Sequence, residues 1–205
     1  RQMCIRDRCY AGLDLASKND LCALTLEFPE SGWILSWSFI PEKHKKIKDM
    51  DRFISRINFC GEEIIDFKLL RKAFLHILGF FDVVELGFDV RFATELIQGI
   101  QDESNIEVIE VPQSAMKLNE ATVSTIDSVL GESLKHNGCI LQLWQFNNCV
   151  TKEDKNECIL VQKTGTSSSK KIDAVAAWIN ARALIINGEE TEHLAKRYKE
   201  TGSFF

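Results

Sequence analysis

The chain has no apolar run long enough to cross a lipid bilayer, and its first residues do not resemble a secretory signal. These absences argue against a membrane or secreted protein, and we expect a cytosolic one. Its 7 cysteines include no Cys-x-x-Cys pair, which indicates neither a disulfide framework nor a zinc ribbon. The chain also lacks an excess of positive charge. Its net charge of -5 argues against a protein that coats nucleic acid without specificity.

What is present is an ordinary globular composition. A chain of 205 residues, 45% of them hydrophobic and 27% charged, suits one domain with a sizeable core. Residues 1–8 fit no regular element and resemble a translated cloning adapter, so we expect a non-native or disordered leader there. Residues 9–205 are then predicted to form the domain, as a fragment of a longer protein. There is no internal repeat.

Apolar patterning predicts the elements of this domain. Closely spaced strands over 10–15, 21–28 and 33–40 predict an antiparallel meander, followed by a polar surface excursion over 41–58. Helices are predicted over 67–80, 91–101, 116–136 and 172–186, and strands over 81–88, 106–111, 139–146 and 158–162. A charged turn is predicted over 151–157, a flexible loop over 165–169 and a polar tail after 187. This order predicts an α/β fold whose mixed sheet, antiparallel meander plus parallel strands, is flanked by helices.

Three aspartates lie in apolar sequence at the ends of predicted elements: Asp14, Asp89 and Asp173. A carboxylate in an apolar run costs free energy unless it is paired or holds a metal. Asp14 is predicted on the central first strand, and Asp89 at the carboxyl end of a neighbouring strand, where open α/β sheets bind ligands. Asp173 is predicted in the first turn of the last helix, with Ser169 as its N-cap. We therefore expect one carboxylate cluster that holds two divalent ions for phosphodiester chemistry.

Each acid also has a simpler structural interpretation. Asp14 and Asp89 would then be caps or turn residues at strand ends, and Asp173 would pair with Lys170 or Lys171. For Asp173 taken alone, the ion pair is the better interpretation. The three acids together favour metal ligation for all of them.

Several motifs, in order, resemble the nuclease domain of phage terminase large subunits, the DNA-packaging motors of tailed phages. The motifs are Gly-Leu-Asp-Leu-Ala-Ser-Lys-Asn-Asp-Leu from Gly12, Phe-Asp at 88–89, Leu-Lys-His-Asn-Gly from Leu134, Trp-Gln-Phe-Asn-Asn from Trp144, and Lys-Ile-Asp-Ala-Val-Ala-Ala from Lys171. The resemblance covers residues 10–185, and it depends on the order and spacing of motifs that are individually weak. It implies an RNase H-like fold in which the three matched acids bind two Mg²⁺ or Mn²⁺ ions.

The resemblance also implies an activity and partners. The expected function is a metal-dependent endonuclease that cuts concatemeric double-stranded DNA during genome packaging, in the cytoplasm of an infected bacterium. The implied partners are the terminase small subunit and the portal protein. The family's packaging ATPase domain is absent from this chain, because Gly165-Thr-Ser-Ser-Ser-Lys170 lacks the Gly before the Lys that a P-loop has. The aromatic after the second acid is displaced here, in Val90-Arg91-Phe92, so local DNA contacts would differ.

Four more polar residues are candidates for supporting the ligands or contacting DNA. Asp20 matches a family position, and a turn explains it equally well. Asn148 would hydrogen-bond near the site or form a hairpin turn, and Lys163 would contact a phosphate or be solvated. Lys171 directly precedes the third acid motif. Two other functions stay open: another RNase H-like nuclease, such as a Holliday-junction resolvase, and a non-catalytic packaging or docking module.

Overall fold

The computed structural model describes residues 7–15, 21–43, 57–90, 94–165 and 170–201. Its central feature is a mixed sheet whose strands are β1 (Arg8–Asp14), β2 (Cys22–Phe28), β3 (Trp33–Ile40), β4 (Ile57–Phe59), β5 (Asp82–Phe88), β6 (Glu107–Glu110) and β7 (Lys135–His136). The strand order is β4-β3-β2-β1-β5-β6, and β7 also pairs with β3. β1, β2 and β3 form an antiparallel meander, while β1, β5 and β6 run parallel. The predicted mixed sheet is therefore confirmed.

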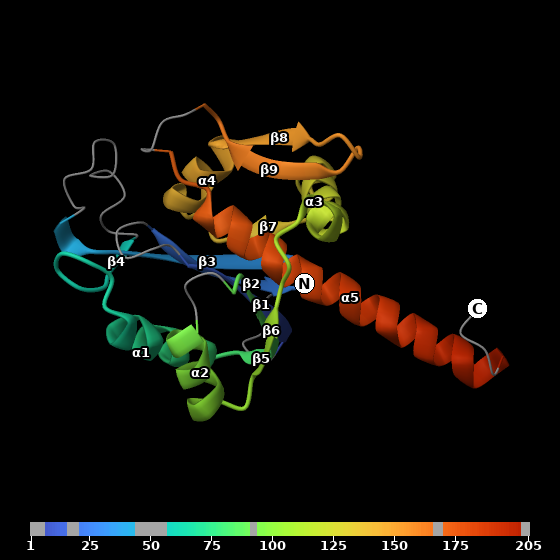
Figure 1. The fold of residues 1–205 in the computed structure, drawn as a ribbon, viewed down its shortest axis with the longest axis horizontal. Coiled ribbons are helices and arrows are strands. Elements are labelled where there is room, and N and C mark those ends of the chain that lie inside the picture. Colours follow the sequence, from blue (N-terminus) through green and yellow to red (C-terminus); the bar gives the residue numbers. More distant parts are fainter. Residues whose placement is uncertain (1–6, 16–20, 44–56, 91–93, 166–169, 202–205) are drawn as a thin grey trace.

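Helices cover both faces of this sheet, and a small hairpin lies on one side (Figure 1). The helices are α1 (Phe67–Leu78), α2 (Thr94–Glu103), α3 (Ala115–Leu130), α4 (Ile140–Asn147) and α5 (Asp173–Thr201), and the hairpin is β8 (Cys149–Glu153) with β9 (Ile159–Lys163). α1 and α2 pack on one face. α5 crosses the other face beneath α3, α4 and the hairpin, and its C-terminal part extends past the sheet (Figure 1). None of the helices in the described ranges is long and apolar enough to cross a membrane.

Strand alternation divides the core between the two faces. On β1, the side chains of Cys9, Ala11 and Leu13 are fully buried in the cluster that also holds α1 and α2 residues. The residues between them face α5, because successive strand side chains point to opposite faces. β2 is buried along its whole length, since helices cover it on both sides. The sheet is therefore the middle layer of three.

A buried ion pair joins α5 to β2. Arg182 on α5 binds the carboxylate of Glu27, whose Oε2 also accepts a hydrogen bond from the Trp178 indole at 2.8 Å. Burial raises the pKa of Glu27, while the charge of Arg182 and the hydrogen bonds from Trp178 and Arg182 oppose that rise. A carboxylate this deeply buried is tolerated only with such partners. The pair fixes the position of α5 along the strand.

Between 116 and 146 one predicted element is wrong and another is too long. The predicted strand over 139–146 is the helix α4, and the predicted helix over 116–136 ends at Leu130, with Gly131 as its C-cap. Lys135 and His136 form β7 instead, beside Trp33 and Ile34 of β3. The Lys135 amide donates to the Gly32 carbonyl at 2.7 Å, a contact with a distant part of the chain that no local pattern reveals.

Other predicted boundaries move by smaller amounts. The predicted turn over 151–157 is occupied in part by β8, and the turn itself lies at 154–158. β4 lies at the end of the predicted surface excursion, and α5 continues to Thr201 rather than ending at 186. β1 begins at Arg8, the last residue of the predicted leader. Residues 1–6, 44–56, 91–93 and 166–169, which include most of the leader, the excursion and the loop, lie outside the described residues.

Candidate functional site

The first two predicted acids lie side by side at one edge of the sheet. β1 and β5 are parallel neighbours, and their register places Leu13 beside Phe88. The next residue of each strand is an aspartate, Asp14 on β1 and Asp89 directly after β5. Both aspartates are half-buried. The carboxyl ends of two adjacent parallel strands thus carry one acid each.

The third acid comes to the same edge on α5. Asp173 is the first residue of that helix, and it is 6% exposed. The next residue, Ala174, packs in a cluster with Ala23, and Ala23 is the residue opposite Asp14 on β2. The helix therefore begins over the edge where β1 ends. Three acids from distant parts of the sequence are gathered at one end of the sheet.

Two glycines allow α5 to lie directly on the strands that carry the acids. A Cβ at Gly12 would lie 1.9 Å from the Ala177 carbonyl oxygen, and a Cβ at Gly87 would lie 3.0 Å from the Asn180 carbonyl oxygen. Each glycine stands two residues before an aspartate, in the pattern Gly-x-Asp. This repeated pattern at two strand ends is a signal that sequence reasoning missed. It marks where helix backbone meets strand backbone beside the site.

Asn180 ties α5 to the end of β1. Its Nδ2 donates to the Leu13 carbonyl at 2.8 Å, one residue before Asp14. Its Oδ1 accepts from Gln113 at 3.0 Å, and Asn180 is 2% exposed. A buried amide bonded on both sides holds a fixed orientation. The helix that carries the third acid is thereby locked to the strand that carries the first.

The start of α5 is held by α4. The Ala174 amide donates to Gln145 Oε1 at 2.8 Å, and Asn148 Nδ2 donates to the Lys171 carbonyl at 3.0 Å. Both bonds are buried. The predicted N-cap, Ser169, lies outside the described residues. Sequence reasoning missed Gln145 because it assigned that segment to a strand.

The candidate supporting residues differ in how far they are buried. Asn148 is buried and holds the segment that leads into α5, as described above. Lys171 is 8% exposed. Lys163 is exposed at the end of β9, opposite Cys149 on β8. Asp20 lies outside the described residues.

A second titratable group, the half-buried thiol of Cys149, is affected by the charge of the third acid. Burial, and next the negative charge of Asp173, raise the pKa of Cys149 to about 12. The donors that the three acids offer are carboxylate oxygens.

Those donors fit a hard divalent cation, since Mg²⁺ and Mn²⁺ prefer carboxylate oxygen. Over the described ranges, however, no three His, Cys, Asp or Glu side chains stand together as a group that could hold a metal ion. The backbone thus places three acids at one edge, without the side chains meeting as a closed cage.

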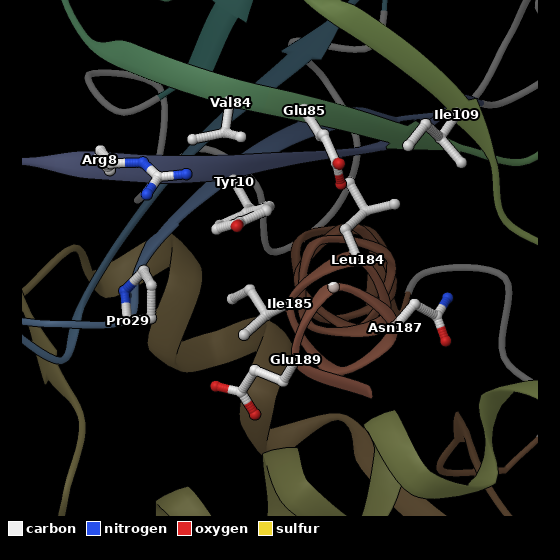
Figure 2. A pocket seen from close by; sticks show the side chains of 11 residues that line it. Arg8, Tyr10, Pro29, Val84, Glu85, Ile109, Leu184, Ile185, Asn187 and Glu189 are labelled. Carbon is white, nitrogen blue, oxygen red and sulfur yellow. The ribbon is translucent and has the colours of Figure 1, made fainter. Parts of the chain in front are cut away.

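A pocket of about 500 Å³ lies elsewhere, where α5 leaves the sheet (Figure 2). Its lining includes Arg8 and Tyr10 of β1, Glu85 of β5, and Leu184 and Glu189 of α5. These strand residues precede Asp14 and Asp89 along their strands, so the pocket lies toward the other end of β1 and β5. It is not part of the edge that carries the acids.

The mixed sheet flanked by helices is an RNase H-like fold. The structure is similar to the HK97 bacteriophage large terminase, with a TM-score of 0.75 and 18% identity over 87% of this chain and 39% of that chain. It is also similar to the large terminase nuclease from thermophilic phage G20c, with a TM-score of 0.55 and 11% identity over 84% of this chain and 80% of that chain. A second G20c structure, with bound magnesium, has a TM-score of 0.56 and 10% identity over 85% and 80% of the two chains.

The sequence itself matches the family described as "Terminase large subunit, endonuclease domain" over residues 2–189. The chain belongs to this family, and it is a terminase endonuclease domain. It spans 39% of the length of the HK97 large terminase. No curated protein has a sequence that matches this chain.

Proposed function

We propose that this domain is a two-metal-ion endonuclease that cuts concatemeric double-stranded DNA while a phage genome is packaged. The observation that carries the proposal is that the backbone brings three acids to one sheet edge, where Leu13 and Phe88 stand side by side and α5 begins at Asp173. Family membership supports endonuclease activity. The magnesium-bound G20c nuclease supports the use of a divalent cation.

Asp14, Asp89 and Asp173 would hold the ions, and Asp14 is the candidate to contact both. Its strand, β1, lies between β5, which leads to Asp89, and β2, over which α5 begins. Asp89 and Asp173 would each contact one ion. Two bound ions would supply an activated water and stabilise the leaving oxygen of the DNA backbone. The three acids would hold the ions and orient them. The burial of Asp173 restricts the movement of its side chain.

Four further residues have proposed supporting roles. Lys163, exposed at the end of β9, would contact a DNA phosphate, and Lys171 would lie close to the same backbone. Asn148 would hold the segment before Asp173, through its bond to the Lys171 carbonyl. Asp20 would support the ligand shell. With a net charge of -5, DNA binding would be weak and would fall steeply with salt.

The whole protein would supply what this domain lacks. An upstream packaging ATPase, the terminase small subunit and the portal protein would bring the DNA to the domain, in the cytoplasm of the infected host. Residues 1–8 would be a leader with no role in the fold apart from Arg8, which begins β1, and residues 9–205 would be the domain. These proposals follow from the family and from the 39% share of the HK97 chain that this chain covers.

Cleavage of supercoiled plasmid tests the metal-dependent activity. The full chain should nick or linearise plasmid with Mg²⁺ or Mn²⁺ and leave it intact in excess chelator. Ca²⁺ should bind without supporting turnover, because its looser coordination positions the attacking water poorly. Cleavage that persists in chelator would show that the metal mechanism is wrong. Preferential cutting of a four-way junction over linear duplex would favour the resolvase alternative.

A further inference from the structure

A buried glutamine bridges three elements beside the site. Gln145 on α4 is fully buried, at 0% exposure. Its Oε1 accepts a hydrogen bond from the Ala174 amide of α5 at 2.8 Å, and its Nε2 donates to Ser38 Oγ of β3 at 3.2 Å. Both ends of the amide are therefore used, and the side chain has one defined orientation.

The bond to Ala174 is a helix cap supplied from outside the helix. The first amides of an α-helix have no partner within it, and a side chain just before the helix usually accepts from one of them. On α5 the acceptor for the second residue comes from α4 instead. The start of α5 is therefore positioned by a different helix, which is itself fixed to the sheet through Ser38.

We propose that Gln145 is a positioning residue for the nuclease reaction. By capping α5 at Ala174 it sets where the neighbouring Asp173 carboxylate stands relative to Asp14 and Asp89. The inference rests on the proposed function, in which Asp173 holds a metal ion. Gln145 itself acts through the helix and contacts neither metal nor DNA.

The chain contains a matched control three residues earlier on the same helix. Gln142 is also buried, at 3% exposure, and its Nε2 donates to Ser36 Oγ of β3 at 3.1 Å. This contact resembles the Gln145–Ser38 bond, but among the described residues Gln142 makes no hydrogen bond to an amide of α5. Gln145→Met and Gln142→Met both replace a buried amide with an apolar side chain of similar length. Only the first removes the cap.

The experiment compares the full-length wild type with Gln145→Met, Gln142→Met and Asp173→Asn. Amide exchange in the segment containing Ala174 measures the cap, and calorimetric titration with Mn²⁺ measures metal affinity without turnover. Plasmid cleavage against Mn²⁺ concentration is the third readout. We expect faster exchange in that segment for Gln145→Met only. We also expect its Mn²⁺ affinity to fall about 10- to 100-fold, as is typical when a residue that orients a metal ligand is lost. Gln142→Met should stay within about threefold of wild type.

The outcomes separate this inference from the proposed function. A wild type that binds no Mn²⁺ overturns both. If wild type binds Mn²⁺ and Asp173→Asn loses that binding, but Gln145→Met binds as Gln142→Met does, only the positioning role is wrong.

A second variant serves if Gln145→Met does not fold. Gln145→Glu keeps an acceptor for the Ala174 amide, so exchange in that segment should stay slow and Mn²⁺ should bind at least as tightly as in wild type. Tenfold weaker binding with the amide still protected would show that the cap does not set the position of Asp173.

Discussion

At the scale of single residues, the sequence points to candidate acids, but it does not show how the fold places them relative to one another. Asp14, Asp89 and Asp173 are proposed as ligands because each interrupts apolar sequence at an element end. The Leu13–Phe88 register that makes two of them neighbours depends on strand pairing between distant segments. The contact of Gln145 with α5 could not be predicted, because a glutamine in an apolar run does not indicate that it caps another helix. The sequence thus suggests candidate ligands, while the residues that support them become visible only through tertiary contacts.

Replacing each acid by its amide separates a ligand from a structural group. Asp14→Asn, Asp89→Asn and Asp173→Asn each remove one of several negative charges gathered at one edge, so metal-free protein should melt at or above the wild-type temperature. Mn²⁺ at about 100 times its dissociation constant should stabilise the wild type by about 2.7 kcal/mol, and each variant by less. The melting temperature with and without Mn²⁺ and the rate of plasmid cleavage are the quantities to measure. A variant that melts several degrees lower yet cuts at a near wild-type rate has lost a structural group, not a ligand.

Buried thiols should limit stability at high pH. Burial, and then the charge of Asp82, raise the pKa of Cys9 from 9.0 to about 12. The folded state favours the neutral thiol, so the contribution of Cys9 to stability is complete below pH 9 and is lost as the pH rises toward 12. At pH 10 the loss is about 1.4 kcal/mol for this one group.

Melting temperatures of the wild type and Cys9→Ala at pH 7 and pH 10 measure this effect. The wild type should lose more stability between these pH values than Cys9→Ala does, although the variant starts lower because its core side chain is smaller. Equal losses would mean that Cys9 ionises as easily in the folded state as in the unfolded chain.

At the scale of elements, long periodic segments were predictable and short apolar ones were not. α1 follows its pattern, with Leu70, Phe74 and Leu78 buried and Gly79 as the C-cap. α4 was mistaken for a strand, because a run of eight residues is too short for its period to decide. Its buried face also includes the polar residues Gln142 and Gln145, which a hydrophobic pattern assigns to the surface. Polar contacts with β3 serines explain that burial.

The contact between α5 and β1 should tolerate no side chain at Gly12. Gly12→Ala would place a methyl group against the Ala177 carbonyl and push the helix off the strand. We expect a loss of about 1–3 kcal/mol or more, as for other added volume in a packed core. Plasmid cleavage should fall further than stability alone explains, because Asp173 moves with the helix. Chemical denaturation and cleavage at saturating Mn²⁺ measure the two effects.

Gly188→Ala, on α5, is the control for a glycine-to-alanine change where there is room for the methyl group. A Cβ at Gly188 meets nothing within 4 Å, and alanine is the better helix former. This variant should be unchanged or up to about 1 kcal/mol more stable, with wild-type cleavage. If Gly12→Ala behaves the same way, the close approach of helix and strand is not required for the fold.

At the scale of the whole molecule, we expect residues 9–189 to fold without the rest of the chain. Among the α5 residues whose side chains the structure describes, the last that packs with a core cluster is Ile186, and the family match ends at residue 189. A chain of residues 9–189 should therefore unfold in one cooperative transition, close to the melting temperature of the full chain. Calorimetry of the two chains tests this. Aggregation of the short chain beside a soluble full chain would show that the removed segments contribute to the fold, including Arg8, which pairs with Asp82 at the start of β1.

The path of the chain through the sheet also governs when the domain can become active. β1 is made early, yet its neighbour on one side, β5, comes some 70 residues later, and α5 comes last of all the elements. Bringing such distant segments together costs loop-closure entropy, and it must await their synthesis. A chain whose synthesis has passed residue 89 but has not reached residue 173 carries Asp14 and Asp89 without the third acid. If the proposed function is right, the domain cannot cut DNA until α5 has been translated. Incomplete chains that end before Asp173 would then leave the phage DNA uncut.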